Sequence, residues 1–490
     1  MMKSCMTIHP KDDVAVALRD LEAGSLAEGI CLAENIPAGH KFSRRPIAAG
    51  EEIRKYGEVI GRAAADIPAG AHVHSHNLKS ILAGAQSYAY TPRECPLSPA
   101  QYPGFMGYRR PDGAVGVRNE IWIIPTVGCV NAVAAEIEKR CAKYAVGSVE
   151  RVVAYNHPYG CSQLSGDHEM TRRFLCALIN HPNAGAVLVL GLGCENNHIA
   201  GMQECLGSWD EGRVAFLNCQ EAEDELSAAE QIIARLAAYA GGFRREPCDA
   251  SELVIGLKCG GSDGFSGISA NPLLGRFSDG LIAAGGSAIL TEVPEMFGAE
   301  HLLMARCADR SVFEKCVDMV NGFKDYFLRY GEGVDENPSP GNRAGGITTL
   351  AEKSLGCTQK GGTAPVTDVI GYGERIKERG LTLLSAPGND LVAACALAAA
   401  GAHIVLFTTG RGTPFGCPVP TVKIASNTPL FEKKRAWMDF DAGCLLQGAD
   451  PAETAHRFAA YVLSVASGER PASEKLSKGD LAIFKDGVTL

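Results

Sequence analysis

The sequence predicts a multidomain α/β protein that begins with a small β-rich domain. A chain of 490 residues is too long to fold around one hydrophobic core, so several domains are expected. The segment 85–104 is rich in proline, which is typical of an extended linker (Pro92, Pro96, Pro99 and Pro103). After this linker, apolar strand-like runs alternate with helical stretches, which predicts mostly parallel sheets.

The composition excludes several classes of protein. The chain is 46% hydrophobic and 21% charged, which is typical of a packed interior and not of a disordered chain. Its net charge of −9 and pI of about 5.8 argue against nucleic acid or an anionic membrane as the main partner. No apolar run reaches the roughly 18 residues of a membrane-spanning helix, and the first residues lack the apolar region of a signal peptide. We therefore expect a cytoplasmic protein whose 18 cysteines are reduced thiols or metal ligands.

The N-terminal domain, residues 1–84, is expected to consist of short strands joined by Ile-Pro-Ala-Gly turns (strands near 13–18, 29–33 and 55–61). Its chemistry is concentrated in histidines. If residues 72–76 form a strand, the imidazoles of His72, His74 and His76 share one face about 7 Å apart. Together with His40, they could hold a metal or bind a ligand carboxylate, whereas a single histidine is most often structural.

The middle domain, residues 105–245, is expected to be an α/β unit with thiols at its strand ends. The turns after three predicted strands each carry a cysteine, and His157 and Glu195 lie in the same turns (Cys129, Cys161 and Cys194). Ligands of parallel sheets bind at the carboxyl ends of the strands, so these positions favour a site. The turn at 191–196 lacks the third glycine of a dinucleotide-binding fingerprint, so no nucleotide site is predicted.

The C-terminal domain, residues 246–490, contains a glycine-rich turn that directly follows the predicted strand 253–257. Cys259, Ser262 and Asp263 lie in this turn, and its glycines leave main-chain amides open to an anion. A second interior strand, 401–407, ends near Arg411, whose guanidinium suits a carboxylate. The plain alternatives are a chain-reversing turn with a buried thiol, and an exposed surface arginine.

Four cysteines, each just after a predicted strand, could converge at sheet edges, where some of them could hold a metal (Cys129, Cys161, Cys194 and Cys259). Thiolates suit iron or zinc, whereas oxygen-liganded ions do not need them. None of these pairs has zinc-finger spacing, so the hypothesis rests on topology. Each thiol could instead be a small buried hydrophobic side chain.

The order of motifs resembles the altronate/galactarate dehydratase family of sugar-acid dehydratases over nearly the whole chain. The matching stretches are spread over all three parts of the sequence (57–61, 107–109, 156–161, 191–195, 259–267, 337–342 and 408–414). Three further stretches are more similar to the altronate branch than to the galactarate branch (8–18, 72–76 and 118–123).

The resemblance implies an N-terminal β-clip domain of the SAF type, a middle α/β domain that forms a homodimer, and a C-terminal Rossmann-like variant with an unusual crossover. It also implies removal of water from a hexonate, with D-altronate giving 2-keto-3-deoxy-D-gluconate in hexuronate catabolism. The implied cofactor is iron(II), with manganese(II) or an iron–sulfur cluster as alternatives.

Dehydration next to a carboxylate needs a base, concentrated positive charge for the enediolate, and an acid for the leaving hydroxyl. We therefore assign three sets of candidate residues. The catalytic set is His157, Arg411, Ser262 and Asp263. The metal ligands come from Cys129, Cys161, Cys194, Cys259, His74 and His76. The substrate-binding set is His40, His72, Gly260, Gly261, Asn271, Asn342, Thr409 and Thr413.

Two other functions remain open from the sequence. A related lyase could act on galactarate or sulfolactate with the same motifs. A protein of another class could bind a metal or a sugar acid without turning it over. Turnover of a panel of acids distinguishes these functions.

Overall fold

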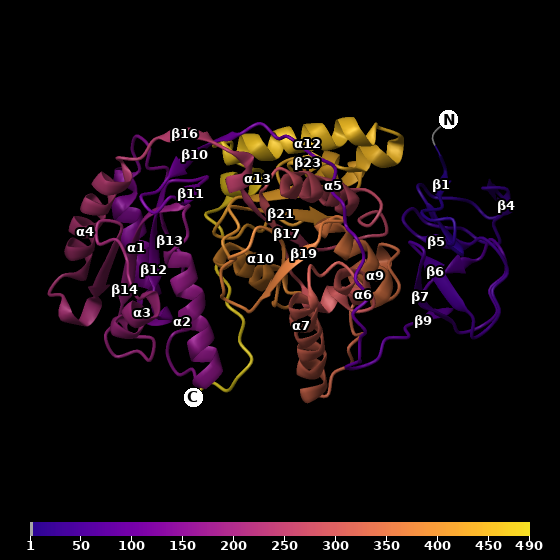
Figure 1. Cartoon of the computed structure of the whole chain (residues 1–490), viewed down its shortest axis with the longest axis horizontal. Coiled ribbons are helices and arrows are strands. Elements are labelled where there is room, and N and C mark those ends of the chain that lie inside the picture. The colour runs from indigo at the N-terminus through magenta and orange to yellow at the C-terminus, as the bar shows by residue number, and fades with distance from the viewer. Residues whose placement is uncertain (1–2) are drawn as a thin grey trace.

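The computed structural model describes residues 3–490, which form three parts along the longest axis. The C-terminal part lies between the middle part and the N-terminal part (Figure 1). The N-terminal part is made of short strands: β1 (Cys5–Met6), β2 (Val14–Ala17), β3 (Leu26–Ala27), β4 (Ile30–Cys31), β5 (Lys41–Ser43), β6 (Glu52–Lys55), β7 (Glu58–Ala63), β8 (His72–Val73) and β9 (Leu78–Lys79). They form the sheets β1-β2-β5-β8 and β6-β7-β9 and the hairpin β3-β4, and every pairing is antiparallel.

One strand expected from the sequence is split in two. Residues 55–61 were expected as one strand, but β6 ends at Lys55 and β7 begins at Glu58. Tyr56 and Gly57 between them have φ angles of 63° and 81°, which is the left-handed pair of a tight hairpin turn. The expected strand therefore supplies both arms of a hairpin.

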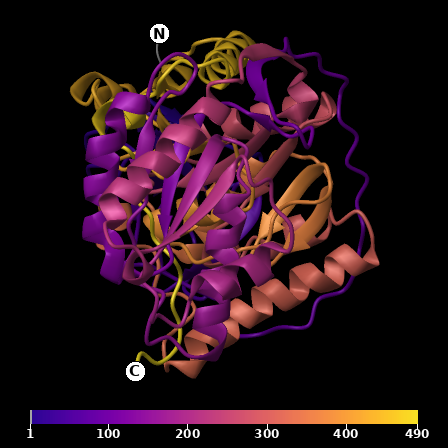
Figure 2. The same ribbon diagram turned by 90° about the vertical axis from the view of Figure 1, so that its left-hand side faces the viewer.

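The linker from Ser80 to Gly104 contains no helix or strand and crosses the outside of the molecule (Figure 2). It is fixed by side chains rather than by sheet pairing. Tyr88 donates a hydrogen bond of 2.7 Å to Glu300, and Tyr90 packs against Phe313 with ring centroids 5.1 Å apart. The proline-rich segment is therefore extended, as the sequence predicted.

The middle part is built on a parallel sheet in the order β13-β12-β14-β15. Its strands are β12 (Glu120–Pro125), β13 (Val152–Ala154), β14 (Ala184–Gly191) and β15 (Val214–Asn218), and its helices are α1 (Asn131–Cys141), α2 (Ser165–Ile179), α3 (Ile199–Leu206) and α4 (Glu225–Ala240). Residues alternate between the two faces of a strand. Ile121 and Ile123 therefore pack under α1 and α4, whereas Trp122 and Ile124 pack against α2.

The C-terminal part contains a seven-stranded parallel sheet in the order β19-β20-β18-β17-β21-β22-β23. Its strands are β17 (Val254–Cys259), β18 (Ser287–Leu290), β19 (Val366–Ile370), β20 (Gly380–Leu384), β21 (Ile404–Thr409), β22 (Thr421–Ala425) and β23 (Phe440–Asp441). Numbered along the chain, this order is 3-4-2-1-5-6-7. It differs from the Rossmann order 3-2-1-4-5-6 by an extra strand between the second and third strands.

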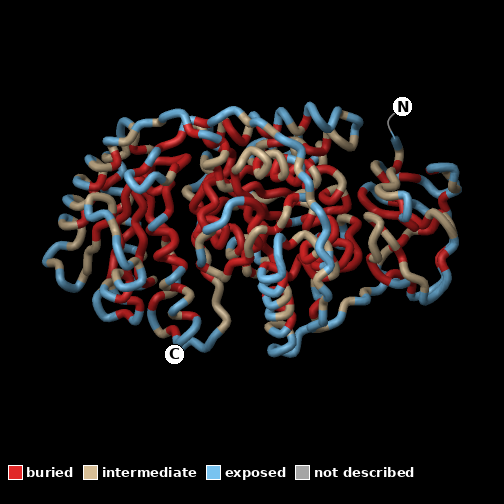
Figure 3. Tube along the Cα trace, in the orientation of Figure 1, coloured by how far each residue is buried: buried red, intermediate tan, exposed pale blue. Residues whose placement is uncertain are grey.

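Helices cover both faces of this sheet. They are α5 (Ala270–Ala283), α6 (Glu300–Met304), α7 (Arg310–Arg329), α8 (Pro340–Ala344), α9 (Leu350–Cys357), α10 (Asp390–Ala399), α11 (Thr428–Lys433), α12 (Pro451–Ala466) and α13 (Ala472–Leu476). Helices α5, α7 and α12 share one core with the sheet, and α10 packs on the opposite face together with α2 of the middle part. The two larger parts therefore share a continuous buried interior (Figure 3).

A small antiparallel sheet ties the chain ends of the middle part together. It has the order β11-β10-β16, formed by β10 (Phe105–Arg109), β11 (Val115–Gly116) and β16 (Arg245–Cys248). Over the described residues 3–490, no helix is long and apolar enough to cross a membrane.

Candidate active site

The carboxyl edge of the seven-stranded sheet is the candidate active site. β17 lies between β18 and β21, from which the chain continues toward opposite edges of the sheet. Ligands of parallel α/β sheets bind outside such a switch point. Cys259 is the last residue of β17, and the glycine-rich turn begins directly after it.

A buried network of charged side chains fills this edge. Lys258 is paired with Glu292 and, at 3.0 Å, with Asp390. Lys360 lies 3.1 Å from Glu292 Oε2 and 2.8 Å from Cys259 Sγ. Glu292 has a φ of 72°, a left-handed conformation that residues other than glycine rarely adopt. The local backbone is therefore held in an unusual conformation by the packing around this carboxylate.

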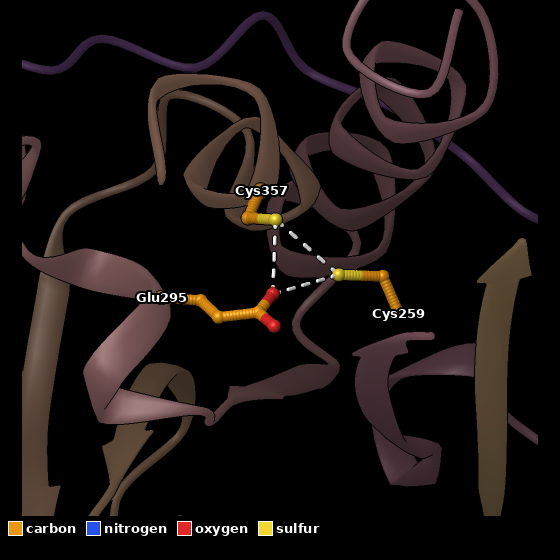
Figure 4. A group of neighbouring side chains, drawn as sticks. All are labelled: Cys259, Glu295 and Cys357. Atoms are coloured by element: carbon orange, nitrogen blue, oxygen red, sulfur yellow. Dashed lines mark hydrogen bonds between the residues drawn. The ribbon is translucent and has the colours of Figure 1, made fainter. Parts of the chain in front are cut away.

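Cys259, Glu295 and Cys357 meet at the centre of the network (Figure 4). The two Sγ atoms are 3.3 Å apart, and Glu295 Oε2 lies 3.3 Å from Cys259 Sγ and 3.1 Å from Cys357 Sγ. Among the described residues, this is the only group of three or more histidine, cysteine, aspartate or glutamate side chains whose ligand atoms all lie within 4.8 Å of one another.

Lysines balance the charge of this group. Burial raises the pKa of Glu295, but Lys353, Lys258 and Lys360 outweigh burial and hold that pKa below its usual range. Lys353 Nζ lies 2.7 Å from Glu295 Oε1. The hydrogen bond with Cys259 and burial raise the pKa of Cys357 well above normal, so this thiol stays protonated. A metal ion here would face three ammonium groups, so the group does not fit a cation.

The structure gives Asp263 a structural position. Its Oδ1 accepts hydrogen bonds of 2.8 Å from both Ser266 and Ser426, and its Oδ2 accepts one of 3.0 Å from Asn427. Burial raises the pKa of Asp263 despite these donors. The Asp263 carboxyl group therefore holds the glycine-rich turn to the loop after β22, and both of its oxygens accept hydrogen bonds within the protein.

Ser262 differs from its neighbour. Its hydroxyl oxygen is buried and has no hydrogen-bond partner in the described structure. It lines a small cavity of about 10 Å³, which also touches Lys353 and Cys357 and has room for about one water molecule. Of the two candidates in this turn, only Ser262 keeps an unused polar group.

Most of the predicted substrate-binding residues hold the loops of the edge together. Asn271 accepts from Thr408 at 2.7 Å and donates to the Gly356 carbonyl, and Asn342 donates to the Ser262 carbonyl at 2.8 Å. The hydroxyl oxygens of Thr409 and Thr413 accept from main-chain N–H groups of their own turn. A side chain at Gly260 would collide with Asp390, and Gly261 has a φ of 61°.

Four histidines of the N-terminal part gather against the candidate site: His40, His72, His74 and His76, called here the imidazole group. The ring centroids of the contacting pairs lie 5.1 to 5.7 Å apart, and His40 Nδ1 lies 3.0 Å from His72 Nε2. The predicted strand of evenly spaced rings is not formed, because β8 ends at Val73 and Asn77 closes a turn onto His72 and His74.

Three rings of the imidazole group, those of His40, His72 and His74, are uncharged at neutral pH. Burial and the neighbouring His40 and His74 lower the pKa of His72 to about 3. Burial also lowers the pKa of His40 and that of His74. Neutral imidazoles accept protons and bind transition metals, so this group has the chemistry that the buried thiol group lacks.

The loop around α8 joins the imidazole group to the glycine-rich turn. His74 Nε2 lies 3.0 Å from the Arg343 carbonyl, and the Gly264 N–H donates to the Gly345 carbonyl at 2.7 Å. Arg411 reaches the same loop through a hydrogen bond of 3.1 Å to the Gly341 carbonyl. The guanidinium groups of Arg343 and Arg411, the arginine pair, are exposed and form no ion pair within residues 3–490.

A buried ion triad fixes the N-terminal part on this site. Glu352 of α9 accepts hydrogen bonds of 2.8 Å from both Lys41 and Lys55. All three side chains are almost fully buried. Burial opposes the ionised form of Glu352, but the two lysines outweigh it and lower its pKa to about 2. The triad thereby holds the imidazole group against the loop around α8, which Arg411 also contacts.

His157, predicted as the base or acid, lies in the middle part with both ring nitrogens occupied. Its Nε2 lies 2.8 Å from the Pro125 carbonyl, and its Nδ1 accepts from the Tyr159 N–H at 3.2 Å. Burial lowers its pKa to about 4. The ring cannot exchange a proton without breaking a main-chain contact, so the structure makes His157 a turn-stabilising residue.

The four predicted thiol ligands are divided between two sheets. Cys129, Cys161 and Cys194 are exposed at the four-stranded sheet, whereas Cys259 is buried at the seven-stranded sheet. No metal-type group of the described residues unites them. Cys259 therefore cannot share a metal ion with the other three thiols, because their strands belong to different sheets.

Sequence patterns missed several residues of the site. Lys353, Cys357 and Lys360 lie on α9 and the turn after it, not after a strand. Glu352, Lys41 and Lys55 gave no pattern because their partners are far away in the chain. The signal available was a run of polar residues in an otherwise buried helix, since every residue of α9 is buried.

Comparison with known proteins assigns the family. Three family profiles match in succession: "Altronate/galactarate dehydratase SAF domain" over residues 3–81, "D-galactarate dehydratase/Altronate hydrolase, second domain" over 107–241, and "D-galactarate/Altronate dehydratase, C-terminal" over 250–489. The N-terminal β part is thus a SAF domain, as the resemblance implied.

Full-length relatives agree with the profiles. The chain is 54% identical to altronate dehydratase of Bacillus subtilis, with 100% of both chains covered. It is 52% identical to altronate dehydratase of Escherichia coli over 99% of both chains. Galactarate dehydratase (L-threo-forming) of Escherichia coli is 34% identical, with 94% of this chain and 92% of that protein covered. The chain therefore belongs to the altronate/galactarate dehydratase family.

Proposed function

We propose that this protein is a hydro-lyase that converts altronate into 2-keto-3-deoxygluconate, a step of hexuronate breakdown. Two relatives that match the chain from end to end carry the name altronate dehydratase. The observation that carries the proposal is local. His74 contacts the Arg343 carbonyl and Arg411 contacts the Gly341 carbonyl, so the imidazole group and both arginines adjoin one loop at the carboxyl edge of the sheet.

In this proposal the arginine pair holds the substrate carboxylate. Guanidinium groups bind carboxylates through paired hydrogen bonds, and Arg343 and Arg411 have no carboxylate partner of their own in the described chain. A ring of the imidazole group that does not hold a metal ion then takes the proton from C2. Burial lowers the pKa of His40, His72 and His74, so these rings are unprotonated at neutral pH. Loss of the C3 hydroxyl gives the enol, which becomes the 2-keto acid when C3 takes a proton from solvent.

The iron(II) that the resemblance implies fits the imidazole group better than the buried thiol group. Neutral imidazoles suit iron(II), whereas three lysines surround Cys259, Glu295 and Cys357. His72, His74 and His76 would hold the ion, with His40 orienting His72 through their 3.0 Å contact. Among described residues these ring nitrogens form no set of three within 4.8 Å, so loading requires side-chain rotation. The ion would supply a Lewis acid for the leaving hydroxyl.

Galactarate and sulfolactate are the competing substrates. Galactarate dehydratase of Escherichia coli is 34% identical, and the (2R)-sulfolactate sulfo-lyase subunit beta of Chromohalobacter salexigens is 30% identical over 78% of this chain. Both values are well below the 54% identity to an altronate dehydratase. The greater identity favours altronate.

The test is an anaerobic assay of purified protein with iron(II) and each acid separately. We expect a 2-keto product from altronate and much lower turnover of galactarate and sulfolactate. Turnover of galactarate above that of altronate would contradict the assignment. Turnover of none, with altronate bound, would favour a binding protein.

The resemblance also implies a homodimer formed through the middle domain, and the composition predicts a cytoplasmic location; both remain predictions. Light scattering of the purified chain tests the dimer. A mass near 51.7 kDa would show a monomer, and twice that value a dimer.

A further inference from the structure

Three exposed thiols at the carboxyl edge of the four-stranded sheet have no role in the proposed dehydration site. They are Cys129, Cys161 and Cys194, called here the thiol edge. Only five of the 18 cysteines are exposed, and the other two, Cys31 and Cys205, lie elsewhere. Exposed thiols are open to oxidation. A bound ligand would explain why three of them lie together on one exposed edge.

The turns that carry these thiols interlock. The Gly128 N–H donates to the Tyr159 carbonyl at 2.8 Å, which places the turn of Cys129 beside that of Cys161. The Ser162 N–H donates to Asn196 Oδ1, and the Asn197 N–H donates to the Gly160 carbonyl, both at 2.9 Å. The turn of Cys161 therefore bridges those of Cys129 and Cys194.

The sheet imposes the same proximity. The thiols follow β13, β12 and β14, which are direct neighbours and run in parallel. Adjacent strands lie about 4.8 Å apart, so their carboxyl ends bring the three turns onto one short edge. The side-chain oxygens of Asn131 and Asn156 are buried at this edge and accept no hydrogen bond from a described residue.

As they are placed, the three thiols do not suit a single metal ion. Two thiolates on a single zinc ion lie at most about 4.6 Å apart, because each metal–sulfur bond is about 2.3 Å. In the described chain the thiols of this edge form no group within 4.8 Å. Each cysteine that binds a 4Fe–4S cluster holds a different iron atom, so the cysteine sulfurs stand further apart than those around one ion.

No further thiol joins the edge. Cys219 follows β15, but it packs against the apolar cluster beneath the sheet.

Two polar side chains also lie near the thiol edge. Glu195 already accepts hydrogen bonds from Thr126 and from the N–H groups of Leu192 and Gly193. Gln220 donates to Cys194 Sγ at 3.5 Å, the kind of contact that orients a metal-bound thiolate.

We propose that Cys129, Cys161 and Cys194 bind a 4Fe–4S cluster at this edge. Soft thiolate ligands select iron–sulfur clusters and no carboxylate is required. Three thiolates leave one iron of the cluster without a protein sulfur. The inference goes beyond the proposed dehydration, because it concerns a different sheet and holds for any substrate.

The test is anaerobic reconstitution of the full chain with iron(II) and sulfide, followed by desalting. We expect about four iron atoms and four acid-labile sulfides per chain, with visible absorption that dithionite bleaches. Cys129→Ser, Cys161→Ser and Cys194→Ser should each lose most of the sulfide and the absorption. Cys31→Ser, an exposed thiol of the SAF domain, is the matched control and should keep both.

Thermal unfolding before reconstitution shows whether the variants fold, so loss of sulfide in a folded variant can be assigned to lost ligands. Iron without sulfide in the wild type, or a cluster retained in the triple serine variant, would overturn the proposal. Failure of the altronate assay would leave this result unaffected, since sulfide content is measured without substrate.

Discussion

In both parallel sheets, reactive residues lie at the carboxyl ends of the strands, but they are buried in one sheet and exposed in the other. At the seven-stranded sheet, Cys259 and two glutamates are buried, and lysines neutralise them. At the four-stranded sheet, the thiol edge is exposed and no charged side chain pairs with it in the described chain. Topology thus decides where a residue lies, whereas burial and its neighbours decide what it can bind.

The largest loss of stability should come from a change in the ion triad of Glu352, Lys41 and Lys55, which fixes the SAF domain on the edge of the seven-stranded sheet. Glu352→Gln leaves Lys41 and Lys55 buried without a carboxylate, which costs roughly 3–5 kcal/mol of unfolding free energy. Urea denaturation measures this loss, and limited proteolysis of the linker reports release of the SAF domain. Glu314→Gln, in an exposed pair with Arg310, is the control and should cost less than about 1 kcal/mol. Equal losses in the two variants would refute the comparison.

His157 should make the four-stranded edge sensitive to acid. Its pKa is about 4 in the folded chain and 6.5 in the reference state, so the neutral ring favours folding. This stability is complete above pH 6.5 and is lost as the pH falls toward 4, by an amount on the order of 3 kcal/mol. His157→Gln should flatten this part of the stability–pH curve and keep altronate turnover within a few-fold, whereas His456→Gln, an exposed control, should leave the curve unchanged. Turnover abolished in a stably folded His157→Gln would restore the catalytic role.

Arg411→Ala tests the carboxylate clamp. A hydrogen bond to a charged group contributes about 1.5–3 kcal/mol, so kcat/KM should fall roughly 10- to 150-fold. Arg411→Lys should recover only part of this, because an ammonium cannot form the paired contact. Arg435→Ala removes an exposed arginine that stacks on Phe431 and should leave the kinetics unchanged. Unchanged kinetics in Arg411→Ala would exclude it from the site.

The smallest effect is expected for stability at the thiol edge. Each cysteine-to-serine change there replaces an exposed side chain, so the cluster-free protein should shift by no more than about 0.5 kcal/mol. Thermal unfolding of the three single variants checks this value. A much larger shift would mean that the thiols are structural and not ligands.

The sequence was enough to locate the ends of the strands, but it could not show which strands belong to the same sheet. Alternating strands and helices were enough to predict parallel sheets, and the thiols do follow the strands. The pattern could not show that Cys259 belongs to another sheet, since sheet membership depends on distant pairings. Lys360 and Cys357 were missed for a related reason, because their contacts with Cys259 span about 100 residues of chain.

The imidazole group shows what a local pattern can establish. The alternation of His72, His74 and His76 predicted that their rings would be close, and His40 joins them. Their arrangement depends on the Asn77 turn, and burial keeps His40, His72 and His74 neutral. Neither contribution is visible in the spacing alone.

The central claim is that the buried edge dehydrates altronate, and proton NMR of the anaerobic reaction in D₂O tests it most directly. We expect altronate to disappear and a 2-keto-3-deoxy acid to form with one deuterium at C3, taken up when the enol becomes the ketone. Altronate left unchanged by the iron-loaded, folded protein, or a product without deuterium at C3, would contradict the proposed dehydration.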